Sequence, residues 1–269
     1  MTAAVVVEDL RVAYGDRVAV DGVRLSVPAG RVVAIVGPNG CGKSTLLRAV
    51  ARLHRPAAGR VTVGGDDVWR LRPRAAARRL ALLPQAPQAP EGITVAGLVR
   101  YGRHPHQGLF RQWSDADAAA AARALAATGV ADLADRRLDR LSGGQRQRCW
   151  LAMTVAQDTP VMLLDEPTSA LDLGHQVEVL RLVRELAAGG RTVLVVLHDL
   201  SAAARYADTI VAMRAGRVVA CGPPAQVVDA ALVRRLYDID ADILAAPGDG
   251  APVIVPAAGR PVGAGAHVH

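Results

Sequence analysis

Short apolar segments with polar interruptions fill the first 36 residues. Hydrophobic positions recur over residues 4–7, 18–20, 23–27 and 31–36, and turn-forming residues such as Gly15-Asp16 and Asp21-Gly22 separate them. This pattern predicts an antiparallel β layer that leads into a buried strand. Further along, a helix is predicted over 43–53, a strand at 61–63, then a basic helical stretch and a strand at 80–83. Alternation of strands and helices predicts a parallel sheet.

The pattern changes between residues 90 and 149, where alanine-rich helical runs occur without a convincing strand. Ser114 and Asp115 are available there as an N-cap. Strands return at 161–164, 192–197, 210–213 and 217–220, with helices at 175–186 and 201–206. The end of the chain is rich in Ala, Pro and Gly and closes with His267, Val268 and His269, so a loose tail is expected. We therefore predict an α/β domain over 1–240, with helices inserted at about 90–150, and a flexible tail over 241–269.

Composition narrows the function classes. The chain has 269 residues, 51% of them hydrophobic, which is enough for one large core. It has no run of roughly 18 apolar residues and no signal-like start, so we expect a cytoplasmic protein.

The cysteines and the charge exclude further classes of site. Cys41, Cys149 and Cys221 lack metal-like spacing and are expected to be reduced thiols. The net charge of +7 comes from scattered arginines without interleaved aromatics, which favours a solvated basic face, able to lie near anionic lipid, over nucleic-acid binding.

A glycine-rich loop follows the strand that ends at residue 36. It matches the pattern G-x-x-x-x-G-K-[ST], in which glycines let successive backbone N–H groups point at phosphate oxygens at a helix N-terminus. Lys43 is expected to reach the β- and γ-phosphates of a nucleotide, and Ser44 to bind Mg²⁺. The predicted nucleotide-binding residues of this segment are Gly37, Pro38, Asn39, Gly40, Cys41, Gly42, Lys43, Ser44 and Thr45.

Two side chains of this loop invite separate hypotheses. Lys43 is the only lysine of a chain with 32 basic residues, which indicates a position that needs a compact ammonium rather than a planar guanidinium. Cys41 lies at a helix N-terminus, where a thiolate would be stabilised and reactive. An inert small side chain is the alternative for Cys41.

A second strand ends in two carboxylates. Residues 161–164 are apolar, and Asp165 and Glu166 follow them. A buried strand would hold both rigidly, so that Asp165 binds Mg²⁺ and Glu166 orients and polarises an attacking water. Strands that end in acidic residues are common by chance. This one indicates a nucleotide site because the same chain also contains the phosphate-binding loop.

A third motif, Leu-Ser-Gly-Gly-Gln at 141–145, is the signature sequence of ABC ATPases, so the chain resembles that family over about residues 3–240. The resemblance implies a RecA-like P-loop NTPase core of α/β class with an antiparallel β subdomain and an inserted α-helical subdomain. It also implies ATP and Mg²⁺ as cofactors. Two copies of the chain would form a dimer in which ATP on one copy is capped by signature residues of the other: Ser142, Gly143, Gly144 and Gln145.

The resemblance assigns further single residues. Tyr14 matches the aromatic that stacks on adenine, Gln85 the Q-loop glutamine that touches Mg²⁺ and the attacking water, and His198 the switch histidine that contacts the γ-phosphate. Residues 169–172 match the D-loop, which crosses the dimer interface. Glu166, His198, Gln85 and Lys43 are thus expected to be catalytic, and Ser44, Gln85 and Asp165 to hold Mg²⁺.

Two segments, 91–107 and 169–176, resemble the ATPases of iron-siderophore, haem and cobalamin importers. This implies integral membrane permease subunits as partners, a substrate-binding protein as an indirect partner, and a peripheral position on the cytoplasmic face of the cell membrane. His104 and His106 have no carboxylate or cysteine cluster beside them and are not expected to bind metal. An ABC transporter ATPase for another cargo is an alternative. So is a soluble ABC ATPase of translation or DNA repair, although the single cassette and the lack of heptads argue against it.

Overall fold

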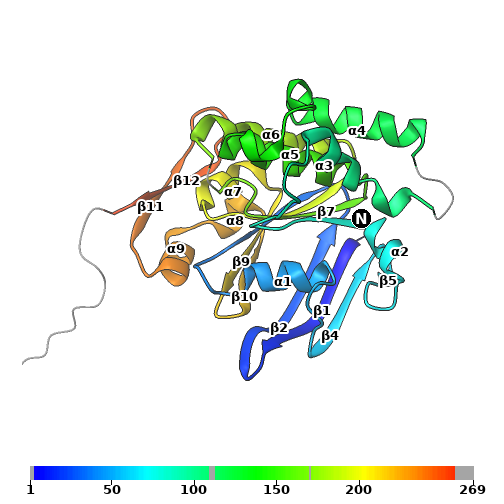
Figure 1. Ribbon diagram of the computed structural model, residues 1–269. Coiled ribbons are helices and arrows are strands. Elements are labelled where there is room, and N and C mark those ends of the chain that lie inside the picture. Colours follow the sequence, from blue (N-terminus) through cyan, green and yellow to red (C-terminus); the bar gives the residue numbers. More distant parts are fainter. Residues whose placement is uncertain (1–2, 109–112, 170, 258–269) are drawn as a thin grey trace, which may run out of the picture.

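A six-stranded sheet forms the centre of the protein, whose computed structural model describes residues 3–108, 113–169 and 171–257. The strand order is β10-β9-β3-β8-β7-β6, and all are parallel except β10, which pairs antiparallel with β9. Figure 1 shows this sheet in the middle of the protein, with β7, β9 and β10 labelled. The strands are β3 (Val32–Val36), β6 (Leu80–Leu83), β7 (Val161–Asp165), β8 (Thr192–Val196), β9 (Thr209–Arg214) and β10 (Arg217–Gly222).

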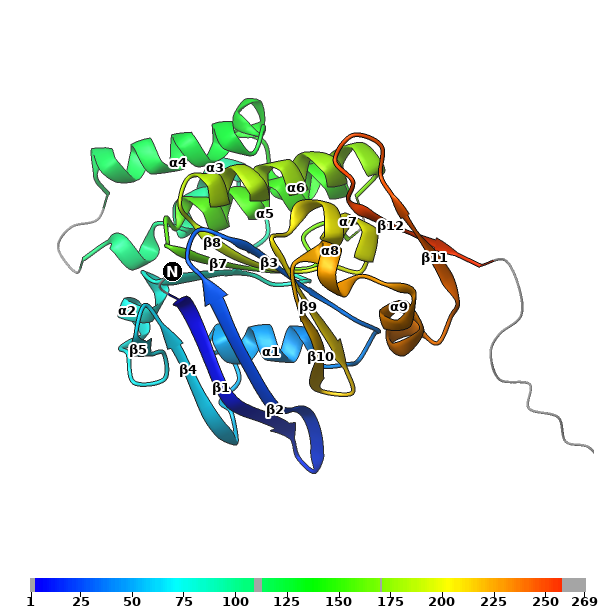
Figure 2. The same ribbon diagram turned by 180° about the vertical axis from the view of Figure 1, so that it is seen from behind.

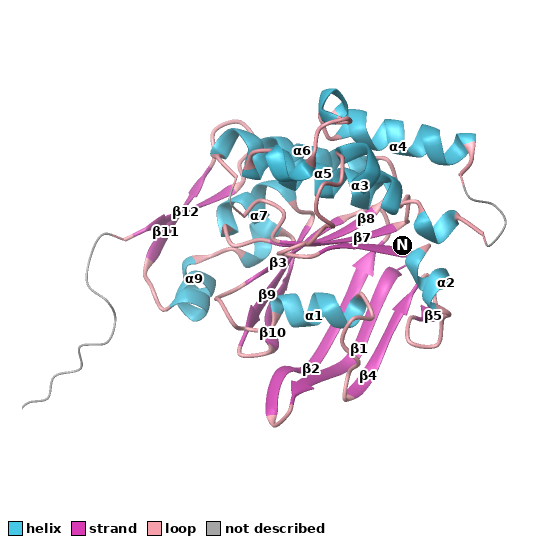
Figure 3. Ribbon diagram, viewed as in Figure 1, coloured by secondary structure: helices cyan, strands magenta, loops and turns pink. Residues whose placement is uncertain are grey.

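The central strands are apolar throughout because both faces of the sheet are covered. All five residues of β3 are buried. Val33 and Ile35 belong to the core that the sheet shares with α1 (Lys43–Val50), whereas Val32, Ala34 and Val36 belong to the core on the helical side. Figure 3 shows the two layers on opposite sides of the sheet. The helical core includes α6 (Leu173–Ala188) and α7 (Leu200–Tyr206).

A second, antiparallel sheet covers α1 from the other side. It consists of β1 (Ala3–Tyr14), β2 (Arg17–Pro28), β4 (Ala58–Val63) and β5 (Asp66–Asp67) in the order β2-β1-β4-β5. The prediction of two strands at 18–20 and 23–27 is wrong, because Asp21 and Gly22 form an irregularity within one strand and not a turn. The helix predicted to reach residue 53 ends at Val50, because Arg52 adopts a left-handed conformation with φ 63°.

The segment between β6 and β7 is helical, and its helices pack on one side of the sheet (Figure 2). Ser114 caps one of them in a reciprocal capping box with Asp117, as the sequence predicts. None of the helices in the described ranges is long and apolar enough to cross a membrane. The helices here and just before β6 are α2 (Pro73–Ala77), α3 (Val95–Tyr101), α4 (Asp115–Ala127) and α5 (Gly143–Ala156), with 3-10 turns at His104–His106, Ala131–Leu133 and Leu138–Arg140.

The end of the chain departs from the expected loose tail. After α8 (Pro224–Val227) and α9 (Ala230–Tyr237), the strands β11 (Ala241–Ala245) and β12 (Pro252–Pro256) form a hairpin. The hairpin is fastened to α7, since Ile254 N donates to Ser201 Oγ (3.1 Å) and Arg205 pairs with Asp249 (2.8 Å). Some of the Ala, Pro and Gly residues that indicated looseness form its turn, at 246–248 and 250–251, and others lie beyond residue 257, outside the described residues. His267, Val268 and His269 lie outside the described residues.

Candidate functional site

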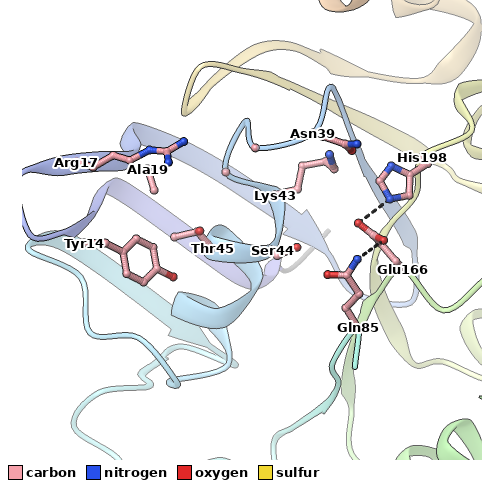
Figure 4. Close-up of a pocket in the computed structure, with 12 residues that line it drawn as sticks. Tyr14, Arg17, Ala19, Asn39, Lys43, Ser44, Thr45, Gln85, Glu166 and His198 are labelled. Carbon is pink, nitrogen blue, oxygen red and sulfur yellow. Dashed lines mark hydrogen bonds and ion pairs between the residues drawn. The ribbon is translucent and has the colours of Figure 1, made fainter. Parts of the chain in front are cut away.

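A cavity of about 510 Å³ opens where the parallel strands β3, β7 and β8 end, beside the tip of the antiparallel sheet (Figure 4). Ligands of open parallel sheets bind at this edge, beyond the carboxyl ends of the strands. The cavity brings together residues from five separate parts of the sequence. Its lining residues are Tyr14, Arg17, Ala19, Asn39, Gly40, Gly42, Lys43, Ser44, Thr45, Gln85, Glu166 and His198.

The glycine loop wraps around the Lys43 ammonium. Lys43 is 5% exposed, and its Nζ donates to the carbonyl oxygens of Gly37 (2.8 Å) and Pro38 (3.0 Å). Gly37 and Gly42 have φ values of 143° and 105°, which side-chain-bearing residues rarely adopt. A Cβ on Gly37 would lie 2.1 Å from the carbonyl oxygen of Met213, at the end of β9. The loop is therefore held tightly, with room for backbone and little else.

Cys41 does not behave as the thiolate hypothesis requires. Its side chain is 5% exposed and belongs to the core below the loop, and it does not line the cavity. Burial raises the pKa of the Cys41 thiol, and the opposing charge of Lys43 is the smaller effect. Burial thus outweighs the charge and the hydrogen bonds that would favour a thiolate, and the alternative of an inert small side chain fits this position better.

Ser44, which lines the cavity, contacts the buried Asp165, which does not itself line it. Ser44 Oγ donates to Asp165 Oδ1 at 2.8 Å, which joins the first turn of α1 to the end of β7. Asp165 is 1% exposed, and burial raises the pKa of its carboxyl, while the hydrogen bond from Ser44 and the charge of Lys43 act against the rise. The pair presents hydroxyl and carboxylate oxygens side by side, which is the chemistry of a hard divalent cation site.

Glu166 is held between two other predicted residues. Gln85 Nε2 donates to Glu166 Oε2 at 2.6 Å, and His198 Nε2 lies 2.7 Å from Oε1 (Figure 4). Glu166 is only 7% exposed and has a φ of 54°, an uncommon conformation for a non-glycine residue. Strain of this kind persists where the surroundings fix a side chain for a task. Here it places a carboxylate at the cavity wall with both oxygens engaged.

Tyr14 lies at the opposite end of the cavity. It is 44% exposed, and its ring packs against the ring of His54 with centroids 4.3 Å apart. Arg17 and Ala19, at the start of β2, line the same end and were missed by the sequence analysis. The alternation of side chains along a strand that follows Tyr14 was the signal that could have found them.

The signature residues lie elsewhere. Ser142 caps α5, with its Oγ accepting from Gln145 N and Gln145 Oε1 accepting from Ser142 N. This leaves the N–H groups of Gly143 and Gly144 at the first turn of a long helix. All four signature residues are described, and none of them lines the cavity of its own chain. Ala170 of the predicted D-loop lies outside the described residues.

Comparison with known proteins finds relatives along most of the chain. The family described as ABC transporter matches residues 20–169. The achromobactin transport ATP-binding protein CbrD of Dickeya dadantii is 48% identical over 254 residues, 94% of each chain. The hemin import ATP-binding protein HmuV of Streptomyces coelicolor is 48% identical over 249 residues, 92% of this chain and 88% of that one.

A solved structure supports the fold. It is an inward-facing ABC transporter assigned to the metal-chelate type, with a TM-score of 0.83 and 28% identity, and the match covers 96% of this chain and 98% of that one. The fold class predicted from the sequence is thereby confirmed.

Proposed function

The chain belongs to the ABC transporter family and binds ATP, and from that premise we propose that it is the ATP-hydrolysing subunit of an importer for ferric siderophores or a related iron complex, haem or cobalamin. The observation that carries the proposal is the 48% identity, over nearly the full chain, to ATP-binding proteins of achromobactin transport and hemin import. The resemblance of segments 91–107 and 169–176 to this group of importers agrees with it.

The residues of the cavity divide the work on ATP. Tyr14 stacks on adenine, and the loop N–H groups and Lys43 bind the phosphates, with the ammonium exchanging its bonds to Gly37 and Pro38 for phosphate oxygens. Glu166 accepts a hydrogen bond from the attacking water and orients it. Gln85 and His198 hold the Glu166 carboxylate in position and reach the γ-phosphate side of the cavity.

The donor set also fits Mg²⁺. Ser44, Asp165 and Gln85 offer hydroxyl, carboxylate and amide oxygens, which are the ligands this ion prefers. When bound, Mg²⁺ neutralises charge on the β- and γ-phosphate oxygens. Ser44 and Asp165 already lie in contact, so little side-chain ordering is needed to hold the ion.

A second copy of the chain completes the site. Because Ser142, Gly143, Gly144 and Gln145 do not line the cavity of their own chain, their helix N-terminus is free to bind the γ-phosphate of ATP held by another copy. ATP would then join two copies, and their closure would drive transport. Hydrolysis removes the γ-phosphate and with it the joining contact.

A groove on the helical side is suited to docking a membrane partner. A hollow of about 520 Å³ is lined by Ile93, Gly97, Arg100, Tyr101, His104, Gln107 and Trp113, and Tyr101 in it is 52% exposed. The 3-10 turn that supplies His104 to the groove is joined to the central sheet, because His106 Nε2 hydrogen-bonds Gln157 O (2.8 Å), and Gln157 Nε2 donates to Leu80 O (3.1 Å) at the start of β6. β6 leads directly to Gln85, so movement of the groove can reach the cavity. We assign this groove to contact with an integral membrane permease, with this chain lying on the cytoplasmic face of the membrane.

Reconstitution tests the proposal. The chain is purified with a permease and a substrate-binding protein from the same organism, placed in liposomes, and assayed for ATP-dependent uptake of a ferric siderophore, haem and cobalamin. We expect uptake of one of these cargoes, and no uptake with Glu166→Gln. Uptake of an unrelated cargo would point to the alternative transporter assignment. Failure to associate with any membrane subunit would favour a soluble ABC ATPase.

A further inference from the structure

Arg17 is the one arginine that lines the nucleotide cavity. It is the first residue of β2 and pairs across the hairpin with Tyr14, the last residue of β1. Ala19, two residues further, lines the cavity as well, whereas Val18 between them does not. Alternate residues of a strand share a face, so β2 directs the Arg17 side chain to the cavity side.

The Arg17 guanidinium is free of protein partners. Two other arginines that pair with residues of this sheet are engaged, since Arg24 of β2 pairs with Asp9 (2.6 Å) and Arg217 of β10 pairs with Asp21 (2.5 Å). Arg17 is exposed, and no acceptor within the described ranges bonds it. Its N–H groups therefore face the cavity without a protein acceptor. Their planar arrangement suits phosphate oxygens.

The position of Arg17 along the cavity indicates which part of a bound nucleotide it would contact. Figure 4 shows it at the Tyr14 end, above the tyrosine ring, with Lys43 between it and the Glu166–His198 pair. This inference rests on the proposed function, in which adenine lies at Tyr14 and the β- and γ-phosphates lie at Lys43. The phosphate between those two ends is the α-phosphate. We propose that Arg17 binds the α-phosphate of the nucleotide and sets the affinity of the chain for ATP and ADP alike.

The α-phosphate is present in substrate and product and does not change its bonds when the β–γ link is cleaved. A contact to it stabilises ground state and transition state equally, so it lowers KM without raising kcat. Removing an exposed, charge-assisted contact is expected to weaken binding roughly tenfold. The loss should shrink at high ionic strength, because salt screens an exposed ion pair.

The test compares Arg17→Ala and Arg17→Lys with the parent. Steady-state ATPase kinetics give kcat and KM, and equilibrium titration with fluorescent ATP and ADP gives both affinities, each at low and high salt. Arg24→Ala serves as the matched control, since Arg24 lies on the same strand, pairs with Asp9 and does not line the cavity. Lys43→Ala reports separately on the proposed nucleotide site.

Support for the proposal is a rise in KM of about tenfold in Arg17→Ala, equal losses for ATP and ADP, an unchanged kcat, and partial recovery in Arg17→Lys. Unchanged affinities, a loss confined to ATP, or a lower kcat at saturating ATP would each overturn it. If Lys43→Ala loses nucleotide while Arg17→Ala does not, only the Arg17 inference fails. If neither variant loses nucleotide, the proposed site itself is wrong.

Discussion

At the scale of single residues, Lys43 combines an unusual composition with a tight environment. In a chain that otherwise uses arginine, the ammonium is 5% exposed and fits between two carbonyl oxygens of the glycine loop. A guanidinium is wider and planar and does not fit this space. We expect Lys43→Arg to lower ATP turnover about a hundredfold, the effect of roughly 3 kcal/mol of lost transition-state stabilisation.

Turnover, nucleotide affinity and thermal melting are measured together for Lys43→Arg. Arg48→Lys is the matched control, because it makes the reverse exchange on the exposed face of the same helix. The control should retain parent activity and both variants should fold. A folded Lys43→Arg protein with near-parent turnover contradicts the need for ammonium geometry.

The three cysteines differ in access. Cys41 and Cys149 are buried, and burial raises the pKa of the Cys149 thiol to about 11, whereas Cys221 is exposed. At neutral pH a maleimide should therefore label Cys221 first and leave ATPase activity intact. Mass spectrometry of the labelled protein, with Cys221→Ser as control, checks this. Rapid inactivation that ATP prevents would restore a reactive Cys41.

The sequence predicted most cavity residues because motif order, strand ends and glycine patterns are local properties. It missed Arg17, whose role depends on which side of β2 it occupies. It left a reactive thiolate and an inert side chain as alternatives for Cys41, because packing decides how far that thiol is buried.

At the scale of elements, a buried ion pair ties the helices of the inserted segment together. Arg103 Nε lies 3.0 Å from Asp117 Oδ1, both side chains are 7% exposed, and Arg103 Nη1 also donates to Ala156 O at the end of α5 (2.7 Å). Removing one partner of a buried pair leaves a charge uncompensated and costs about 3 kcal/mol or more. Asp117→Asn should therefore destabilise the protein strongly at neutral pH.

The same pair predicts a pH dependence. Burial acts to raise the pKa of Asp117, but hydrogen bonds from Ser114 and Arg103 outweigh it, and the net pKa is lowered. A lowered folded-state pKa means that the stabilisation is complete above the unfolded value of about 3.9 and is lost as pH falls through the folded value. Urea unfolding should show a gap between parent and Asp117→Asn at pH 7 that narrows in acid. A gap independent of pH contradicts this. Asp139→Asn, in an exposed pair with Arg137, should change little at any pH.

The C-terminal hairpin is the element that the sequence patterns did not predict. β11 and β12 are short strands joined by a turn, and their contacts reach Ser201 and Arg205, distant in sequence. The content of Ala, Pro and Gly predicts a flexible segment there. The hairpin is nevertheless ordered, because residues distant in sequence bind it, and composition carries no information about such contacts. The central strands were predictable because burial on both faces leaves a continuous apolar run.

For the whole molecule, the separation of signature and cavity within one chain predicts ATP-dependent dimers. Glu166→Gln keeps the shape of the side chain but cannot polarise water, so ATP should bind and remain uncleaved. The variant should elute as a dimer in size-exclusion chromatography with ATP and Mg²⁺, and as a smaller species with ADP. Ser142→Arg in the same background should prevent the dimer. A Glu166→Gln protein that hydrolyses ATP at the parent rate contradicts the role of Glu166.

The single lysine has a further practical meaning. Apart from the chain terminus, the protein carries one primary amine, and that amine lies in the phosphate loop. Isotopic labelling of lysine would therefore give one side-chain NMR signal, free of overlap, from the centre of the nucleotide site. Its chemical shift would follow the exchange of carbonyl partners for phosphate in real time. Because arginine replaces lysine everywhere else in the chain, the site can be observed spectroscopically without an introduced label.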